Sequence, residues 1–374
     1  MLTNSLAYVA LNLAPKVGPI KANQLITAFG DITELFSASR SQLTAIRGIG
    51  ETIATNLLDP ALITQAKQEI EECQKRGLTL ITKADPLYPK TLLHYPDAPI
   101  VLYIWGEITP IDLHSIAMVG TRAATAYGKQ ITQEISSSLA KADYTIISGL
   151  ARGIDTYAHQ AAVDAGGRTI AVLGSGLAQL YPPENLELAQ TIANGHGAII
   201  SEFPLYMPPD RQLFPMRNRI VASWGESLIV TESPTKSGSL ITANLAVERG
   251  KTVYAVPGPV NRPHSSGCHQ LIREGATLLT CASELLEDEA LFPNLKHSFN
   301  SNPSISEKNS TSKLQTTKQT EHSNLLDLLA APSSAEEVAT QLSMNIDEVL
   351  TLLTELELNG LVETDATGLF IKTN

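Results

Sequence analysis

Glycines, hydroxyl side chains and arginines gather in the middle of the sequence, either directly after short apolar runs or where a predicted helix begins. They form five groups: Gly120-Thr121-Arg122, Ser148-Gly149-Leu150-Ala151-Arg152-Gly153, Gly174-Ser175-Gly176, Phe214-Pro215-Met216-Arg217-Asn218-Arg219 and Lys236-Ser237-Gly238-Ser239. Glycine allows close approach to the backbone, hydroxyls and helix N-termini donate hydrogen bonds, and arginine pairs with two phosphate oxygens at once. The five groups therefore predict a site that binds phosphate.

The apolar runs next to these groups are typical of strands that are buried on both faces. Because the runs are continuous and alternate with amphipathic helices, they predict a Rossmann-like, doubly wound α/β fold with a mostly parallel sheet. Ligands of such sheets bind beyond the carboxyl ends of the strands, so we expect the groups to meet at one edge. The predicted strands span 100–106, 115–121, 144–149, 169–176, 198–203, 227–233, 252–258 and 276–280.

Common catalytic and nucleotide-binding patterns are absent from the sequence. No GxGxxG follows the first core strand, and no Walker A spacing connects Gly120 with Gly128 and Lys129. His159 follows Asp155 by four residues, which suits either a base with its orienting group or a local hydrogen bond that stabilises a helix. No catalytic residue, metal site or cofactor is predicted.

Composition narrows the possible partners. The 374 residues carry a formal net charge of -11, so binding to nucleic acid requires a local basic site. Cys73, Cys268 and Cys281 lack the spacing of a disulfide framework or a zinc site. No apolar run reaches the roughly 18 to 20 residues of a membrane span, and no signal peptide is recognisable, so we expect a cytoplasmic protein.

Four parts are predicted along the chain. Residues 1–81 form an N-terminal helical domain, 82–290 the Rossmann-like core, 291–322 a disordered linker and 323–374 a winged helix. In the winged helix, Ser333 or Ser334 is expected to cap a helix, and two short strands are expected around Asp365-Ala366-Thr367-Gly368.

Both flanking domains resemble DNA-binding modules, but acidic residues offset the bases of the first, and the second is acidic. The turns Val17-Gly18-Pro19-Ile20 and Ile46-Arg47-Gly48-Ile49-Gly50 resemble helix-hairpin-helix (SAM-like) turns, with plain glycine turns between helices as the alternative. An acidic recognition helix repels phosphate, so we expect the winged helix to bind a protein partner or to regulate. Lys372 is its only basic residue, and its acidic residues include Glu336, Glu337, Asp347, Glu348, Glu355, Glu357, Glu363 and Asp365.

Seven blocks of the core resemble, in order, the signature blocks of the bacterial DprA family (DNA-processing protein A, or Smf). The resemblance implies a protein without enzymatic activity that binds single-stranded DNA without sequence preference and loads the recombinase RecA onto it during natural transformation. It also implies a homodimer through residues 271–286, with Leu279 at its apolar edge. The blocks are MVGTRAATAYG (118–128), SGLARGIDTYAH (148–159), TIAVLGSGLAQLYPPEN (169–185), ISEFP (200–204), FPMRNRIVAS (214–223), SPTKSGSLITANLAVERGKTVYAVPG (233–258) and SSGCHQLIREGA (265–276).

The resemblance also implies which residues of this chain form the family's phosphate pocket. Arg211 stands where the family commonly has lysine, and Phe214 is expected to stack on a base. His269-Gln270 stands where many members have asparagine. Together with the loops identified above, the candidate DNA site is Gly120, Thr121, Arg122, Ser148, Gly149, Arg152, Gly174, Arg211, Phe214, Arg217, Asn218, Arg219, Lys236, Ser237, Gly238 and Ser239.

The sequence gives less support to two alternative functions. The phosphoribohydrolases that act on nucleoside monophosphates bind phosphate on a related fold, but their PGGxGTxxE signature is absent, and SPTKSGSLITAN offers no counterpart of their catalytic glutamate. A transcription factor that uses the winged helix is the second alternative, and the acidity of that domain argues against it.

Overall fold

The computed structural model describes residues 2–291, 329, 333–342, 349, 353, 362–364 and 369–372. The chain divides into two compact units, Met1–Pro293 and Asn294–Asn374. No helix among the described residues is long and apolar enough to cross a membrane.

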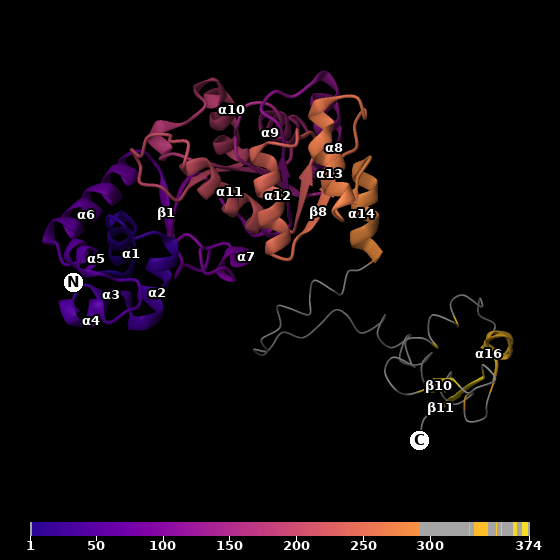
Figure 1. The fold of residues 1–374 in the computed structure, drawn as a ribbon, viewed down its shortest axis with the longest axis horizontal. Helices are drawn as coiled ribbons and strands as arrows, with labels where there is room; N and C mark the ends of the chain where they lie inside the picture. Colours follow the sequence, from indigo (N-terminus) through magenta and orange to yellow (C-terminus); the bar gives the residue numbers. More distant parts are fainter. Residues whose placement is uncertain are drawn as a thin grey trace. The chain divides into compact units, whose positions relative to one another are not determined.

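The first unit begins with a group of short helices around a leucine-rich core (Figure 1). Gly18 and Gly50 are the N-cap residues of the second and fifth helices, so both predicted glycine turns do open helices. Leu25, Leu35 and Leu43 are fully buried between them. The helices are α1 (Asn4–Leu13), α2 (Pro19–Phe29), α3 (Ile32–Leu35), α4 (Arg40–Thr44), α5 (Glu51–Leu57) and α6 (Pro60–Lys75).

A nine-stranded sheet forms the rest of this unit, in the order β1-β2-β6-β5-β4-β3-β7-β8-β9. β1 and β2 are antiparallel to their neighbours, and all pairs from β6 to β9 are parallel, so the predicted mostly parallel sheet is confirmed. The strands are β1 (Thr79–Thr82), β2 (Val101–Gly106), β3 (Ser115–Val119), β4 (Thr145–Ser148), β5 (Thr169–Val172), β6 (Gly197–Ser201), β7 (Ser227–Val230), β8 (Thr252–Ala255) and β9 (Thr277–Leu278).

Strand β1 was not anticipated. The helical pattern predicted for residues 1–81 is wrong at its end, because Thr79–Thr82 pairs with β2 and crosses the expected domain boundary. Three of these four residues are β-branched and therefore favour a strand.

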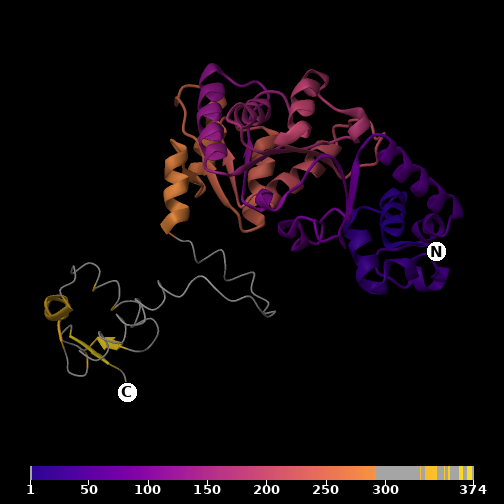
Figure 2. The same cartoon turned by 180° about the vertical axis from the view of Figure 1, so that it is seen from behind.

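Helices cover both faces of the sheet, which explains why its strands are apolar throughout (Figures 1 and 2). Ala117 and Val119 of β3 pack in the core with α11, α12 and α13, whereas Ile116 and Met118 pack with α8, α9 and α14. The helices of the sheet region are α7 (Lys90–Leu93), α8 (Ala126–Lys141), α9 (Ile154–Asp164), α10 (Leu186–Thr191), α11 (Leu213–Trp224), α12 (Gly238–Glu248), α13 (Ser266–Arg273) and α14 (Ala282–Leu291), with short turns η1 (Pro110–Leu113), η2 (Leu177–Gln179), η3 (Pro183–Asn185), η4 (Ile192–His196) and η5 (Pro263–Ser265).

The winding of the chain reverses between β3 and β7. From β3 the chain runs through α8 and α9 to β4 and β5 on one side, whereas from β7 it runs through α12 to β8 on the other side. The loops after β3 and β7 therefore diverge at the carboxyl edge of the sheet. Ligands of open α/β sheets bind at this kind of switch point.

The described part of the second unit agrees with the predicted winged helix. Ser334 Oγ accepts from the Glu337 backbone N–H (3.3 Å), and Glu337 Oε2 accepts from the Ser334 N–H (3.0 Å), so Ser334 caps α16 (Ala335–Leu342). The two predicted strands form an antiparallel pair, β10 (Val362–Thr364) and β11 (Phe370–Lys372). The predicted linker lies outside the described residues, apart from residue 291, which ends α14.

Candidate functional site

A pocket of about 410 Å³ opens at the switch point between β3 and β7. It is lined by the loops after β3, β4 and β7, by the first turns of α9 and α12 and by the second turn of α11. The loops that the sequence predicted to converge therefore do meet at one edge of the sheet. Of the candidate residues, this pocket collects Gly120, Thr121, Arg122, Arg217, Asn218, Lys236, Ser237, Gly238 and Ser239.

The loop after β3 is held so that Arg122 faces solvent. The Thr121 backbone N–H donates to the Glu232 carbonyl (2.7 Å), and Thr121 Oγ1 accepts from the Ala123 N–H (3.2 Å). A Cβ at Gly120 would lie 2.5 Å from Ile154 Cγ1, so only glycine lets the loop pass this close to α9. The Arg122 side chain is exposed at the rim of the pocket.

The N-terminus of α12 also lines the pocket. Its N-cap residue, Ser237, makes no side-chain capping bond, because the Ser237 hydroxyl pairs with those of Ser233 (2.6 Å) and Ser239 (2.7 Å). A Cβ at Gly238 would meet nothing within 4 Å. The first N–H groups of α12 and the exposed Lys236 thus offer an anion both hydrogen bonds and positive charge.

Arg217 forms the floor of the pocket rather than its rim. Only 3% of Arg217 is exposed, and its guanidinium donates to the carbonyls of Gly149 and Val172, which follow β4 and end β5. Burial lowers the pKa of Arg217 to about 10, although Asp155 opposes this shift and Arg122 adds to it. Arg217 therefore holds two strand ends together and leaves its charge beneath the pocket.

The buried pair Asp155 and His159 braces the loop after β4. Asp155 Oδ2 accepts from the N–H groups of Gly149 (3.1 Å) and Ala151 (3.4 Å), and burial raises the pKa of the Asp155 carboxyl. His159 Nε2 accepts from the Leu150 N–H (3.3 Å), while Nδ1 lies 2.6 Å from the Thr169 hydroxyl. Asp155 and His159 thus bond to other groups. They are neither a base with its orienting group nor a pair whose hydrogen bond stabilises the helix.

Aromatic side chains extend the site away from the pocket. The Phe214 ring lies 5.2 Å beneath the Arg122 guanidinium and 5.8 Å from the Tyr181 ring. A Cβ at Gly174 would come within 2.8 Å of Phe214 Cδ1, so Gly174 makes room for that ring. Tyr181 was missed from the sequence, although it lies in one of the resembling blocks, because no spacing marks a half-buried tyrosine as a ligand contact.

Two candidate residues face away from the pocket. The Ser148 hydroxyl is fully buried and donates to the Met118 carbonyl (2.6 Å), so it joins β4 to β3. Arg219 is also buried, where it pairs with Glu202 and lies 3.9 Å from Asp97 Oδ2. The side chains of Ser148 and Arg219 therefore hold the sheet region together and do not line the pocket.

Two further candidate residues lie outside the pocket, and so does His269, which is not one of the candidates. Arg152 is exposed but paired with Glu184, and Arg211 is exposed in the loop before α11. His269 Nε2 lies 2.9 Å from the Gly258 carbonyl, so this side chain ties α13 to the loop after β8.

Metal-binding and redox features are not found in the described part of the chain. No group of three or more His, Cys, Asp or Glu side chains there could hold a metal ion. The three cysteines are free thiols, with Cys73 and Cys268 buried and Cys281 exposed.

Three family descriptions match the chain. Residues 79–290 match DNA recombination-mediator protein A, residues 9–59 a helix-hairpin-helix motif, and residues 310–367 the DprA winged helix domain. The first match alone covers more than half of the chain.

Individual relatives agree with these matches. Protein Smf of Synechocystis is 35% identical over 290 residues, which cover 76% of this chain and 73% of that protein. The X-ray structure of DNA processing protein A from Streptococcus pneumoniae is similar with a TM-score of 0.61, at 32% identity, over 76% of this chain and 97% of that one. DNA processing protein A from Helicobacter pylori, described for its single-stranded DNA binding mode, is similar with a TM-score of 0.52, at 29% identity, over 57% of this chain and 96% of that one.

Proposed function

Because the chain belongs to the DNA recombination-mediator protein A (DprA/Smf) family, we propose that it binds single-stranded DNA without sequence preference and loads RecA onto that DNA during transformation. It acts in the cytoplasm, as a homodimer and by binding rather than by catalysis. The family is one of DNA-processing proteins, and the relative from H. pylori is described as binding single-stranded DNA.

The observation that carries this proposal is the pocket at the switch point. Arg122 and Lys236 are both exposed and both line it, and the uncapped N-terminus of α12 lies beside Lys236. These groups suit phosphate oxygens, which are the same in every nucleotide, so they favour binding that ignores base sequence. Asp155 and His159 next to the pocket are buried and engaged in bonds to the loop, which also favours a holding role.

Salt dependence tests the DNA-binding proposal. If roughly three to five phosphates of a single strand meet cationic groups of each subunit, the slope of log affinity against log salt is expected to be about -2 to -3.5 per subunit. Fluorescence anisotropy of a labelled oligonucleotide at several salt concentrations measures this slope, with duplex DNA and a second base sequence as comparisons. An affinity that does not change with salt would contradict a phosphate site.

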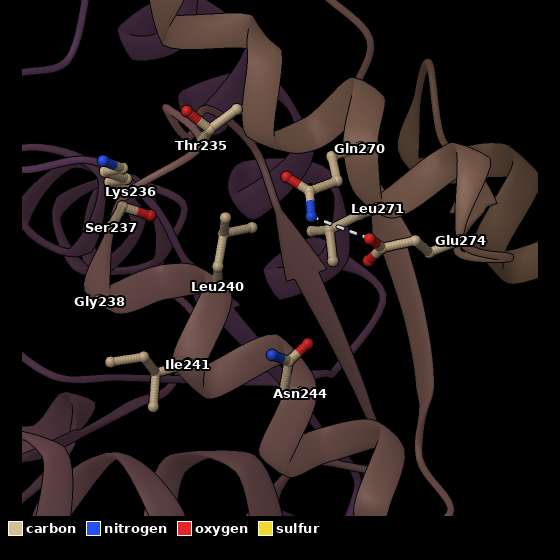
Figure 3. A pocket seen from close by; sticks show the side chains of 10 residues that line it. All are labelled: Thr235, Lys236, Ser237, Gly238, Leu240, Ile241, Asn244, Gln270, Leu271 and Glu274. Atoms are coloured by element: carbon tan, nitrogen blue, oxygen red, sulfur yellow. Dashed lines mark hydrogen bonds between the residues drawn. The ribbon is translucent and has the colours of Figure 1, made fainter.

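The proposed dimer surface lies along α12, α13 and β9. Figure 3 shows the groove between α12 and α13, with Leu240 and Asn244 from α12 on the side of Gln270, Leu271 and Glu274 from α13, and with Ile241 pointing away from α13. Ile241 and Val247 are 48% and 62% exposed, and Leu278 on the edge strand β9 is 46% exposed. An open strand edge beside exposed apolar side chains is typical of a surface that pairs with a second copy.

Leu279, which the sequence placed at the apolar dimer edge, is in the core. It is fully buried among Ile116, Tyr254 and Leu285, so a charge there would destabilise the fold instead of the dimer. Leu278, one residue earlier, has its side chain at the surface.

Replacing Leu278 with glutamate is expected to weaken dimerisation at least tenfold, because two copies of the charge would be brought together at an apolar contact. Analytical ultracentrifugation measures the dimer, and strand exchange by RecA on DNA coated with single-strand binding protein measures loading. RecA loading is expected to decrease as the fraction of dimer decreases, because in a dimer the binding of DNA to one site raises the effective concentration of that DNA at the other site. Leu93→Glu on α7, where the leucine is 40% exposed, is the matched control and should change neither. Full loading by a monomeric Leu278→Glu protein would show that the dimer is dispensable.

A further inference from the structure

Beyond the pocket, four side chains form a continuous row at the carboxyl edge of the sheet. Arg122 lies over the Phe214 ring (5.2 Å), the Phe214 and Tyr181 rings are 5.8 Å apart with a tilt of 51°, and Arg152 lies over Tyr181 (5.5 Å). The row therefore begins at an exposed arginine of the pocket and continues across two aromatic rings.

Arg152, at the far end of the row, already interacts with two neighbouring side chains. It forms an ion pair with Glu184, and its Nη1 donates to Tyr181 Oη (3.2 Å). The positive charge of Arg152 is thus balanced by a carboxylate before any DNA arrives. Its position suits holding the Tyr181 ring better than attracting a phosphate.

We propose that Tyr181 is a base-stacking residue, which takes the nucleotide next to the one on Phe214 along the strand. This inference rests on the proposed single-stranded DNA binding and adds a path for the strand, from the pocket across Phe214 to Tyr181. Stacking platforms for single strands combine a cationic groove with successive aromatic rings, and every base has a face that can stack.

The guanidinium groups that now lie on the rings do not block this path. Arg122 and Arg152 are both exposed, and the Arg152–Glu184 pair is about half exposed on each side, where ion pairs are weak. A base gains more from an aromatic ring than a cation gains from a ring at an exposed site. A base can therefore displace either guanidinium, and Arg122 is then free to contact a phosphate.

Tyr206, like Tyr181, lies next to an arginine and a glutamate, but it is not part of the row of side chains that begins at Arg122. Arg76 lies 5.4 Å from the Tyr206 ring and donates to Tyr206 Oη (2.9 Å), and that hydroxyl donates to Glu72 Oε2 (3.3 Å). Tyr206 is 48% exposed. It provides a matched control, since its replacement removes a similar arginine–tyrosine–glutamate arrangement at a site without Arg122 or Lys236.

The test compares oligo-dT with an abasic strand of equal length that keeps its phosphates. Tyr181→Leu is expected to weaken binding of full-length protein to oligo-dT about five- to hundredfold, the range observed for loss of one stacked base. Tyr181→Phe, Tyr181→Trp and Tyr206→Leu should stay within about twofold of the wild type. The slope against salt should not change in any of them, because no charge is removed.

The abasic strand separates stacking from a supporting role of the ring. Tyr181→Leu and the wild type should bind the abasic strand equally, whereas equal losses on both strands would show that Tyr181 only supports the loop and would overturn the proposal. Unchanged binding of oligo-dT by Tyr181→Leu would also overturn it while leaving the DNA-binding function in place. A wild type that binds neither strand would overturn both proposals.

Discussion

Replacing Arg122 and Lys236 together with alanine is expected to weaken single-stranded DNA binding about a hundredfold or more. Both side chains are exposed, and they flank the same pocket from the loops after β3 and β7. Losing one hydrogen bond to a charged group costs about 1.5 to 3 kcal/mol, and each 1.4 kcal/mol is a factor of ten in affinity. Fluorescence anisotropy at one fixed salt concentration measures the loss, and the salt slope should fall by about 1.4 for two phosphates of a single strand.

Lys372→Ala is the control for this double variant. Lys372 is exposed on β11 of the acidic second unit, so its removal takes away a positive charge that is not part of the pocket. We expect its affinity to remain within about twofold of the wild type. Equal losses in the two proteins would contradict the placement of the DNA site at the switch point.

The architecture of the core could be predicted because its pattern is repeated. Eight apolar runs predicted eight strands, and β2 to β9 are those strands. Strand β1 was not predicted, because it is short and follows a helical segment without a separate apolar run. The order β4-β3-β7 could not be predicted from spacing, since it depends on which way each crossover turns.

The candidate site could be predicted at the level of loops but not for every side chain. Arg217 and Arg219 share one motif, yet residues two apart on a helix point in different directions. Arg217 of α11 consequently lies under the pocket, whereas Arg219 pairs with Glu202 on the other side of the helix. Helical spacing within the motif could have shown that both arginines cannot serve one pocket.

Burial also decides roles that residue type alone leaves open. Asp155 and Glu232 are carboxylates next to a proposed phosphate site, where free negative charge would repel DNA. Asp155 instead accepts two N–H groups of the loop after β4, and Glu232 accepts from the Thr125 N–H (2.8 Å) and hydroxyl (2.7 Å) at the start of α8. Each carboxylate shapes a loop, which the sequence could not reveal.

Replacing His159 with glutamine is expected to remove a large acid-dependent loss of stability. Burial, with a contribution from Arg217, lowers the pKa of His159 in the folded protein to about 3, compared with 6.5 when it is exposed. Between these two values the unfolded chain binds the extra proton, so the stability from a neutral His159 is fully present above pH 6.5 and is lost as the pH falls toward 3. The expected loss approaches about 1.4 kcal/mol per pH unit and amounts to about 2 kcal/mol from pH 6.5 to pH 4.5.

Urea unfolding of the wild type and of His159→Gln at a series of pH values measures this difference. Glutamine keeps an acceptor for the Leu150 N–H but does not titrate, so the variant should be less stable at pH 7 and should lose less stability with acid. Burial raises the pKa values of Asp155 and Glu202, so the folded protein takes up these protons more readily than the unfolded chain. These two groups therefore favour the folded state as the pH falls, which is opposite to the effect of His159. Both groups remain in the two proteins, so their contributions largely cancel in the comparison. Parallel curves of unfolding free energy against pH would show that His159 is not held neutral by the fold.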